Sequence, residues 1–227
     1  MPAMFFWLGC SECTHQHWEI TQETLEEGMK TPTLPKEEAM METASVENSD
    51  TMIISPYDDL FRKYSSEINW DWRLLASLVY QESNFKENSR SRSGAYGLMQ
   101  MMPATMKNYG VDTTATPEKH IAAGVKYIKY LDEIMSRYVP DENERVKFVL
   151  ASYNIGPGHV LDAYRIARKV GKQSGVWENN VDSCLLRKRE PQYYQLPEVR
   201  HGKCHGQETF AFVTKVMKRY GDYKSKI

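Results

Sequence analysis

The sequence predicts a mostly α-helical protein built around one core domain. Apolar residues recur every three or four positions through most of the chain, which is the spacing of one face of a helix. No stretch alternates apolar and polar residues for long enough to indicate a strand, and no repeat of fixed period is visible. A length of 227 residues suits one core domain with an appended segment.

The two parts of the chain differ in charge. The formal net charge is −1, but residues 1–55 carry ten acidic and two basic side chains, whereas residues 56–227 carry 27 basic and 20 acidic ones. We therefore expect the positive part to attract an anionic partner. It has no nucleic-acid-binding motif and no stripe of basic and aromatic residues, so we expect no nucleic acid among its partners.

Residues 1–54 are predicted to precede the core domain as a disordered acidic segment. The apolar run Pro2–Gly9 is too short to span a membrane and lacks the basic start of a secretory signal. Leu8-Gly9-Cys10 resembles the end of a bacterial lipoprotein signal, in which Cys10 is acylated, and this fits if translation starts upstream of Met1. The alternative is a disordered tail with an unrelated cysteine. Residues 11–50 lack apolar periodicity, so they are predicted to form a flexible linker.

The core domain is predicted to begin with a helix that Ser55 caps, with Pro56 in its first turn. Its apolar stripe consists of Tyr57, Leu60, Phe61, Tyr64 and Ile68.

The second predicted helix carries a carboxyl group on its apolar face. Leu74, Leu75, Leu78 and Val79 form this face, and Glu82 is the next position on it. Burial disfavours the ionised form of a carboxyl group and raises its pKa. We therefore expect Glu82 to hold a proton near neutral pH and to act as a general acid. The alternative is a Glu at the edge of the stripe with its carboxylate in water.

A polar loop, Lys86–Ser93, is predicted after this helix. It ends in Gly94-Ala95-Tyr96-Gly97, whose small residues allow close approach of the backbone to other groups. Pro103 is predicted to open a short helix that ends at Gly110.

Two longer helices are predicted next. Thr116-Pro117-Glu118 opens the first, which has Ile121, Val125, Ile128, Leu131, Met135 and Tyr138 on one face. Asp141 is predicted to cap the second, and its apolar stripe ends at Tyr153. Gly156-Pro157-Gly158 is predicted to break it.

The remainder of the chain is predicted to contain two helices and one irregular segment. The first helix runs from His159 to about Val170, and residues 172–205 are predicted to be irregular. The last helix groups Phe212, Val213, Val216, Met217 and Tyr220, and is predicted to stop at Gly221.

Three motifs, in this order, resemble the soluble lytic transglycosylase (SLT) domain family. They are Glu82-Ser83, the stretch Gly97–Thr105 (GLMQMMPAT), and Ala151–Gly158 (ASYNIGPG). The resemblance spans roughly Ser55 to Tyr220 and is greatest to the catalytic part of the transglycosylase F group. It implies a lysozyme-like fold for residues 55–227. It also implies cleavage of the β-1,4 bond between N-acetylmuramic acid and N-acetylglucosamine in peptidoglycan.

The resemblance also implies roles for individual residues. Glu82 is the acid and then the base, while Ser91, Gln100 and Met102 line the cleft around the cleaved bond. Tyr153 forms a hydrogen bond near Glu82 and orients it, and Asn154 binds the acetamido group or the glycan. The alternative is that Met102 and Tyr153 are only packed in the core, and that Ser91 belongs only to its loop.

The motifs offer one carboxyl group, whereas ordinary glycosidases use two. Asp112, Asp132 and Asp162 lie outside the motifs, and we expect them to be solvated. The family route implied by the resemblance needs one acid, because the sugar supplies the nucleophile and a 1,6-anhydro product forms without water. Two alternatives remain, a hydrolytic muramidase similar to goose-type lysozyme and a glycan-binding module without activity.

Two positions depart from the family pattern. Ser152 replaces a common Ala, and Phe212 stands where an ETRNYV-like segment has Tyr, which leaves only a packing role there. The large substrate-binding domain that precedes this module in the transglycosylase F group is absent from the sequence.

Cys184 and Cys204 enclose a loop of roughly twenty residues, and in an exported protein a disulfide between them would stabilise the fold by about 3 kcal/mol. The weaker alternative is a zinc site that uses His201 and His205 beside Cys204. We expect no metal and no cofactor. We expect a monomer that binds peptidoglycan glycan strands in the bacterial periplasm, anchored to the outer membrane through Cys10.

Overall fold

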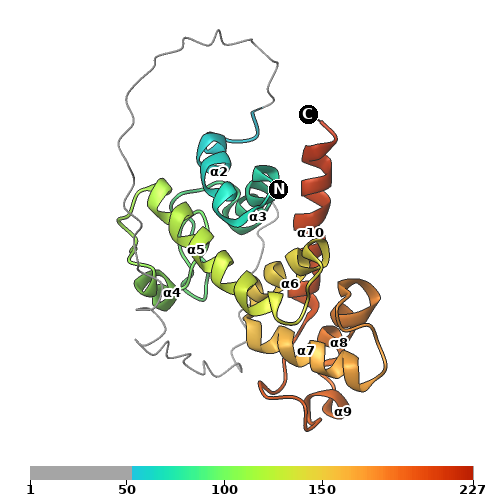
Figure 1. Ribbon diagram of the computed structural model, residues 1–227. Coiled ribbons are helices and arrows are strands. Elements are labelled where there is room, and N and C mark those ends of the chain that lie inside the picture. The colour runs from blue at the N-terminus through green and yellow to red at the C-terminus, as the bar shows by residue number, and fades with distance from the viewer. Residues whose placement is uncertain (1–52, 227) are drawn as a thin grey trace, which may run out of the picture.

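The computed structural model describes residues 53–226, and the prediction of a mostly α-helical domain with a lysozyme-like fold is confirmed. This part of the chain contains no strand, only isolated bridges in the loop that follows α3 (Figure 1). Cys10 and the predicted linker, residues 11–50, lie outside the described residues. The helices are α2 (Asp58–Ser65), α3 (Trp72–Ser83), α4 (Pro103–Asn108), α5 (Pro117–Ser136), α6 (Glu142–Ile155), α7 (Pro157–Lys169), α8 (Asp182–Arg187), α9 (Pro191–Tyr194) and α10 (Gln207–Lys224).

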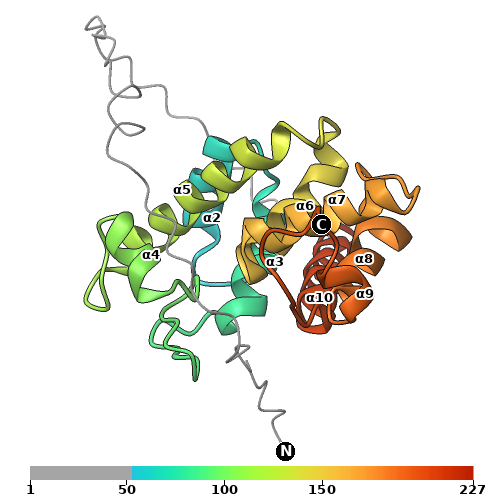
Figure 2. The same ribbon diagram turned by 90° about the horizontal axis from the view of Figure 1, so that it is seen from below.

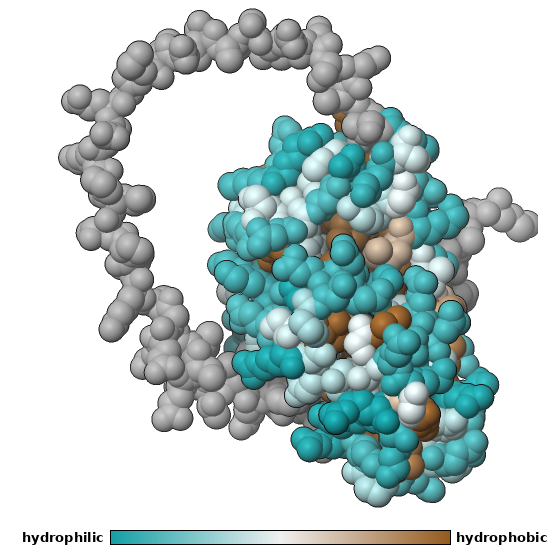
Figure 3. Space-filling view, turned by 45° about the vertical axis from the view of Figure 1, so that its right-hand side comes forward, coloured by the Kyte–Doolittle hydropathy of each residue, from teal (hydrophilic) through white to brown (hydrophobic). Residues whose placement is uncertain are grey.

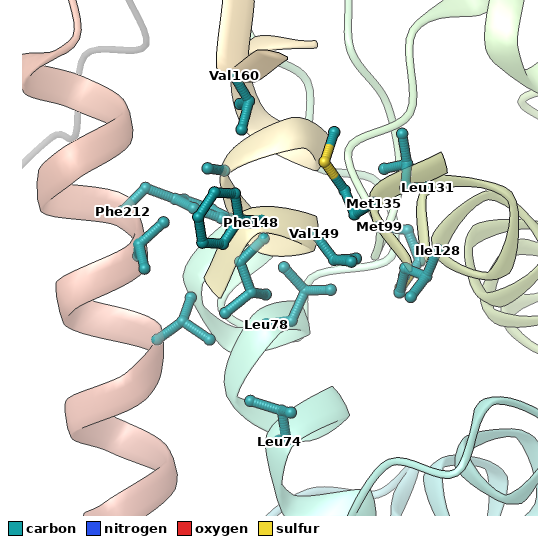
Figure 4. Close-up of a cluster of buried hydrophobic side chains, with 14 of the residues drawn as sticks. Leu74, Leu78, Met99, Ile128, Leu131, Met135, Phe148, Val149, Val160 and Phe212 are labelled. Carbon is teal, nitrogen blue, oxygen red and sulfur yellow. The ribbon is translucent and has the colours of Figure 1, made fainter. Parts of the chain in front are cut away.

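The helices surround one apolar core. Helix α3 packs between α2 and α10, and α6 contacts α5, α7 and α10 (Figures 1 and 2). Side chains from the loop that precedes α4 join those of the surrounding helices in the core, part of which Figure 4 shows. The labelled core residues are Leu74, Leu78, Met99, Ile128, Leu131, Met135, Phe148, Val149, Val160 and Phe212.

The predicted caps of the two long helices are confirmed, whereas the start of the first helix was placed too early. Thr116 Oγ1 accepts a hydrogen bond from the Lys119 amide at 3.4 Å, and the Asp141 carboxylate accepts one from Glu144 at 3.0 Å. Helix α2 begins only at Asp58. The Asp58 carboxylate accepts the hydrogen bonds of the preceding amides, which holds the residues before α2 outside the helix.

Two predictions about the C-terminal part were wrong. Residues 172–205 contain α8, α9 and a kinked segment at Trp177–Val181, in which Glu178 and Asn179 depart from helical geometry. The sequence did not reveal α8 and α9 because these helices are too short to show helical periodicity. Helix α10 continues through Gly221 to Lys224. A glycine inside a helix costs about 1 kcal/mol, which neighbouring turns of a packed helix can offset.

The surface carries few large apolar side chains. None of the described helices is both long enough and apolar enough to cross a membrane. The face in Figure 3 is mostly hydrophilic, with apolar residues in small separate patches. Among the described residues, the large hydrophobic side chains that are exposed come from separate segments, namely Ile53, Tyr138, Val170 and Phe210.

Close contact between α5 and the loop before α4 depends on Gly124. A Cβ atom at this position would lie 2.4 Å from Met99 Cε and 2.8 Å from its Cγ, and Met99 is fully buried. We expect Gly124→Ala to lower the free energy of unfolding by about 1–2 kcal/mol, because overpacking outweighs the better helix propensity of Ala. The matched control is Gly221→Ala in α10, where an added Cβ atom would have no atom outside its own helix backbone within 4 Å. It should raise stability by about 0.5–1 kcal/mol, and urea denaturation of both variants measures the difference. A stabilising effect at both positions would contradict the close contact.

Candidate active site

Glu82 lies in the last turn of α3 and continues its buried face. Leu75, Leu78 and Val79 on this face are fully buried. The Glu82 side chain itself is half-buried, which leaves part of it open to the surface. A residue that is anchored in the core and reaches the surface at its end is well placed to meet a ligand.

Burial raises the pKa of the Glu82 carboxyl from its ordinary 4.5 to about 8. No charged group among the described residues contributes to this shift, so the surrounding protein acts by displacing water. The C-terminal end of α3 carries a partial negative charge, which likewise disfavours a carboxylate there. The carboxyl group is therefore largely protonated at neutral pH.

The backbone turns sharply directly after Glu82. Asn84 and Phe85 have φ values of +53° and +61°, in the left-handed region that residues other than glycine rarely adopt. Phe85 is held there by Phe61 and Tyr80, whose ring centroids lie 6.0 and 5.5 Å from its own. This packing compensates the backbone strain and ends α3 one residue after the acid.

Gln100 fastens the loop that follows. Its side-chain amide donates hydrogen bonds to the carbonyl oxygens of Ser89 at 3.0 Å and Gly97 at 2.8 Å. Its own backbone is left-handed, with φ of +46°. The amide nitrogen of Gln100 is thus used within the protein, and its oxygen is the group left to accept a hydrogen bond from a ligand.

Ser91 and Met102 form hydrogen bonds within their own segments of the chain. The Ser91 hydroxyl accepts a hydrogen bond from the Ala95 amide at 2.9 Å and lies 3.0 Å from the Ser93 hydroxyl, so it closes a turn. Met102 is half-buried and occupies the N-cap position of α4, where its carbonyl oxygen accepts a hydrogen bond from the Met106 amide. Neither arrangement tests the predicted contacts of these residues with a glycan.

Tyr153, in the last turn of α6, lies close to Glu82. A negative charge on Glu82 contributes to raising the pKa of Tyr153 well above its ordinary value, after the larger effect of burial. The Tyr153 hydroxyl donates a hydrogen bond to the Met99 carbonyl oxygen at 2.6 Å. It therefore fixes the loop beside Glu82, and its oxygen keeps the capacity to accept a hydrogen bond from the protonated acid.

A group of tyrosines that the sequence analysis missed extends this region. The Tyr127 ring of α5 lies 5.4 Å from that of Tyr153, and Tyr109 and Tyr130 lie 5.9 and 6.4 Å from Tyr127. The sequence held a signal for them, because Tyr127 and Tyr130 are offset from the apolar stripe of α5. The ring of Tyr153 therefore continues into a row of tyrosine rings from α5 and the end of α4.

Asn154 connects α6 to α10. Its side-chain oxygen accepts a hydrogen bond from the hydroxyl of buried Thr209 at 2.7 Å. The two N–H groups of Asn154 remain as donors for a ligand. Phe212, one turn further along α10, is buried, which agrees with a packing role at the position where the family pattern has Tyr.

Asp162 was expected to be solvated, and this was wrong. Its side chain is fully buried, and it forms an ion pair with the equally buried Lys188 at 2.6 Å. The backbone amides of Arg200 and His201 also donate to it, at 2.9 and 2.8 Å. Burial raises the pKa of Asp162, but these hydrogen bonds and the charge of Lys188 outweigh burial and hold it below its usual value.

The buried ion pair lies behind the glycine-rich turn between α6 and α7. A Cβ atom on Gly158, in the first turn of α7, would lie 2.5 Å from the His201 ring, so the glycine makes space for this ring. The Lys188 ammonium also donates to His159 Nδ1 at 2.7 Å. Burial, followed by the charge of Lys188, lowers the pKa of His159 to about 4, which keeps this ring neutral.

Cys184 and Cys204 are both buried in the core. Cys184 is a thiol in the structure, and burial raises its pKa. The disulfide between them therefore stays a prediction for the exported protein. Among residues 53–226, no group of three His, Cys, Asp or Glu side chains could hold a metal ion.

The raised pKa of Glu82 predicts that the carboxylate form destabilises the fold. The folded protein binds the proton more tightly than the unfolded chain, so stability falls as the pH rises from about 4.5 to about 8. At about 1.4 kcal/mol per pKa unit, the upper bound is about 5 kcal/mol, and solvent access reduces this to about 1–3 kcal/mol.

We expect Glu82→Gln to be more stable than the wild type at pH 9 by that amount, and about equally stable at pH 4. Urea denaturation at both pH values tests this, with Glu67→Gln on an exposed residue as the control. A constant difference between Glu82→Gln and the wild type across this range would contradict the raised pKa.

The fold and this site define a helical domain with one protonated acid at the end of a buried helix, beside tyrosines and a braced loop. The profile of the Transglycosylase SLT domain matches residues 59–175, and the chain belongs to this family. Membrane-bound lytic murein transglycosylase F of Vibrio parahaemolyticus is 38% identical over 164 residues, which are 71% of this chain and 30% of the relative. The protein of the same name from Shewanella sediminis is 39% identical over 168 residues, 72% of this chain and 33% of the relative.

The chain thus spans about a third of the length of these relatives. A solved structure of the 70 kDa soluble lytic transglycosylase from Escherichia coli aligns with 74% of this chain and 24% of its own, at 23% identity and a TM-score of 0.48.

Proposed function

We propose that this domain is a peptidoglycan lytic transglycosylase, in which Glu82 cleaves the β-1,4 bond between N-acetylmuramic acid and N-acetylglucosamine without water. The observation that carries the proposal is the pKa of Glu82, raised to about 8 by burial. An acid with this pKa is protonated at neutral pH and can donate its proton to a leaving oxygen.

In the proposed reaction the Glu82 proton goes to the glycosidic oxygen as the bond between that oxygen and C1 of the muramic sugar breaks. The 2-acetamido group of the sugar stabilises the positive charge that develops at C1. The Glu82 carboxylate then takes the proton of the C6 hydroxyl, whose oxygen bonds to C1. The acid is regenerated, and the product is a 1,6-anhydro sugar.

The surroundings of Glu82 support a route with one acid. In a retaining glycosidase the second carboxyl group lies about 5 Å from the first, where its charge would add to the raised pKa. No such contribution from a second carboxylate is present at Glu82 among the described residues, where burial raises the pKa. This favours help from the substrate over a carboxylate nucleophile.

The other residues have supporting roles in this proposal. The Tyr153 hydroxyl donates a hydrogen bond to the Met99 carbonyl oxygen, which keeps the hydroxyl oxygen of Tyr153 near Glu82. Tyr153 therefore positions the acid. The N–H groups of Asn154 and the oxygen of Gln100 bind polar groups of the glycan, and Ser91 and Met102 shape the cleft. We further propose that the protein is a monomer in the bacterial periplasm, anchored to the outer membrane by acylation of Cys10.

Digestion of purified sacculi tests the reaction. We expect the wild type to release fragments with 1,6-anhydromuramic ends, which mass spectrometry separates from reducing ends because they are lighter by one water. Reducing ends alone would establish the hydrolytic alternative. Binding to sacculi without any released fragment would establish the glycan-binding alternative.

The pH dependence of the rate gives a second test. Because Glu82 must start protonated, we expect kcat/KM to fall above a pH of about 8 and to be level down to about pH 6. The carboxylate needed for the second step is formed in the first step, so no second group has to be ionised in advance. A bell-shaped profile between pH 5 and 9 would contradict the route with one acid.

A further inference from the structure

A small polar pocket lies at the N-terminal end of α5, apart from Glu82. It has a volume of about 150 Å³ and lies between the loop that follows α3 and residues 113–115. Its polar lining comes from Glu87, Asn88, Tyr96, Thr113, Thr114 and His120. The volume is below the roughly 300–1,000 Å³ of sites for drug-sized ligands, so it suits one substituent and not a whole sugar ring.

His120 is the unusual member of this lining. Its side chain is only 3% exposed, and neither ring nitrogen has a hydrogen-bond partner of good geometry among the described residues. The Asp112 backbone comes close enough to the ring to favour its protonated form, which leaves at least one ring nitrogen without a protein partner. An unpaired buried polar group costs about 1–3 kcal/mol, so nearly all such groups in proteins are paired with protein, water or ligand. The hydrogen-bonding capacity of His120 is therefore available to whatever occupies the pocket.

The neighbours of His120 leave room for this ring and hold it in place. The Tyr96 ring lies 5.8 Å from it, and the Tyr96 hydroxyl is occupied by the Asn88 side chain at 2.8 Å. A Cβ atom on Gly97 would lie 3.1 Å from His120 Nδ1, so the glycine makes space for the ring. Tyr96 and Gly97 belong to the loop that continues to Met99 and Gln100, which joins the pocket to the region of Glu82.

The charges around the pocket favour a neutral occupant. Burial lowers the pKa of His120, although a hydrogen bond to the Asp112 backbone and the charge of Asp112 oppose this, so the ring is neutral at pH 7 and carries one donor and one acceptor. Glu87 lines the pocket, and no Lys or Arg does. An anion in the pocket would meet Glu87 without a cationic partner in the lining.

A neutral group that both donates and accepts hydrogen bonds, and that fits the volume, is a secondary amide. We propose that this pocket is a subsite for a secondary amide of the substrate, with His120 as one of its hydrogen-bond partners. The inference rests on the proposed function, because peptidoglycan carries such amides in the acetamido groups of its sugars and in its stem peptides. The remaining partners are the hydroxyl of Thr113 and the hydroxyl oxygen of Thr114, whose proton is already donated to Asp112 at 2.7 Å.

The test uses the full chain with ¹⁵N-labelled histidine, and the His120 ring signals are assigned by their loss in His120→Gln. Three probes are added separately: an N-acetylglucosamine tetramer, a stem tetrapeptide without sugar, and cellotetraose, which has hydroxyls but no amide. We expect at least one amide probe to shift the His120 signals and cellotetraose to leave them in place. A shift with the tetramer assigns the acetamido group, and a shift with the peptide assigns the stem.

Variants provide the affinity readout for the same probes. We expect Thr113→Val, at the exposed rim, and His120→Gln to weaken binding of the active probe about three- to tenfold, the loss of one hydrogen bond. The exposed His205→Ala should not change binding. His120 signals that stay in place with both amide probes, or that move equally with cellotetraose, would overturn the subsite.

Digestion of sacculi by the wild type, run in parallel, separates this inference from the proposed function. Anhydro products together with unmoved His120 signals would overturn the subsite and leave the function standing. Shifted His120 signals without anhydro products would overturn the function, and the amide site would remain.

Discussion

Replacing Glu82 by Gln is expected to lower the rate of peptidoglycan cleavage by a factor of about 100 to 10,000. The amide of Gln has nearly the same size as the protonated carboxyl group but cannot give a proton to the leaving oxygen. Nor can it take the proton of the C6 hydroxyl in the second step. The loss should appear in kcat, while binding to sacculi stays close to that of the wild type.

The control for this variant is Glu67→Gln, which makes the same chemical change on an exposed residue. It should cleave at the rate of the wild type. Because we expect Glu82→Gln to be at least as stable as the wild type, unfolding would not explain its loss of activity. Cleavage by Glu82→Gln within a factor of about ten of the wild type would contradict the assignment of the acid.

Breaking the buried ion pair between Lys188 and Asp162 is expected to have the largest effect on stability. Lys188→Met removes the fully buried partner of Asp162 and leaves the carboxylate in a site from which water is excluded, with the partly exposed Arg165 at 2.8 Å as its remaining ion-pair partner of fixed charge. Removal of one member of a buried pair costs about 3–5 kcal/mol. We expect a loss of this size in the free energy of unfolding at pH 7, measured by urea denaturation.

A double-mutant cycle measures the interaction energy between Lys188 and Asp162 separately from the effect of each single substitution. Lys188→Met with Asp162→Asn removes both charges and should be more stable than the sum of the single losses predicts, by about 1–3 kcal/mol. The exposed pair Lys218–Asp222 is the control, and Lys218→Met should cost less than about 0.5 kcal/mol. Additive losses within the buried pair would contradict its description as a coupled unit.

The long helices and the position of Glu82 could be predicted because the signals for them are local. The stripe of Leu75, Leu78 and Val79 locates the buried face of α3 within the sequence, and Glu82 continues it. The caps at Thr116 and Asp141 likewise act within their own first turns. Helical periodicity and capping need no knowledge of the rest of the fold.

The interactions that were missed join residues far apart in the chain. Asp162 is buried because Lys188 reaches it from 26 residues away, and the Tyr153 hydroxyl finds the Met99 carbonyl 54 residues before it. The occupied side chain of Asn154 depends on Thr209 of α10. No periodicity within one segment indicates such pairs, and the left-handed backbone of Phe85 likewise depends in part on the ring of Phe61 in α2.

The pKa of Glu82 is the quantity on which the proposed chemistry depends most directly. A titration of the wild type followed by ¹³C NMR of its side-chain carboxyl groups measures it, with the Glu82 signal assigned by its absence in Glu82→Gln. The account predicts a midpoint of about 8. A midpoint between about 4 and 5, the range of a solvated glutamate, would contradict it.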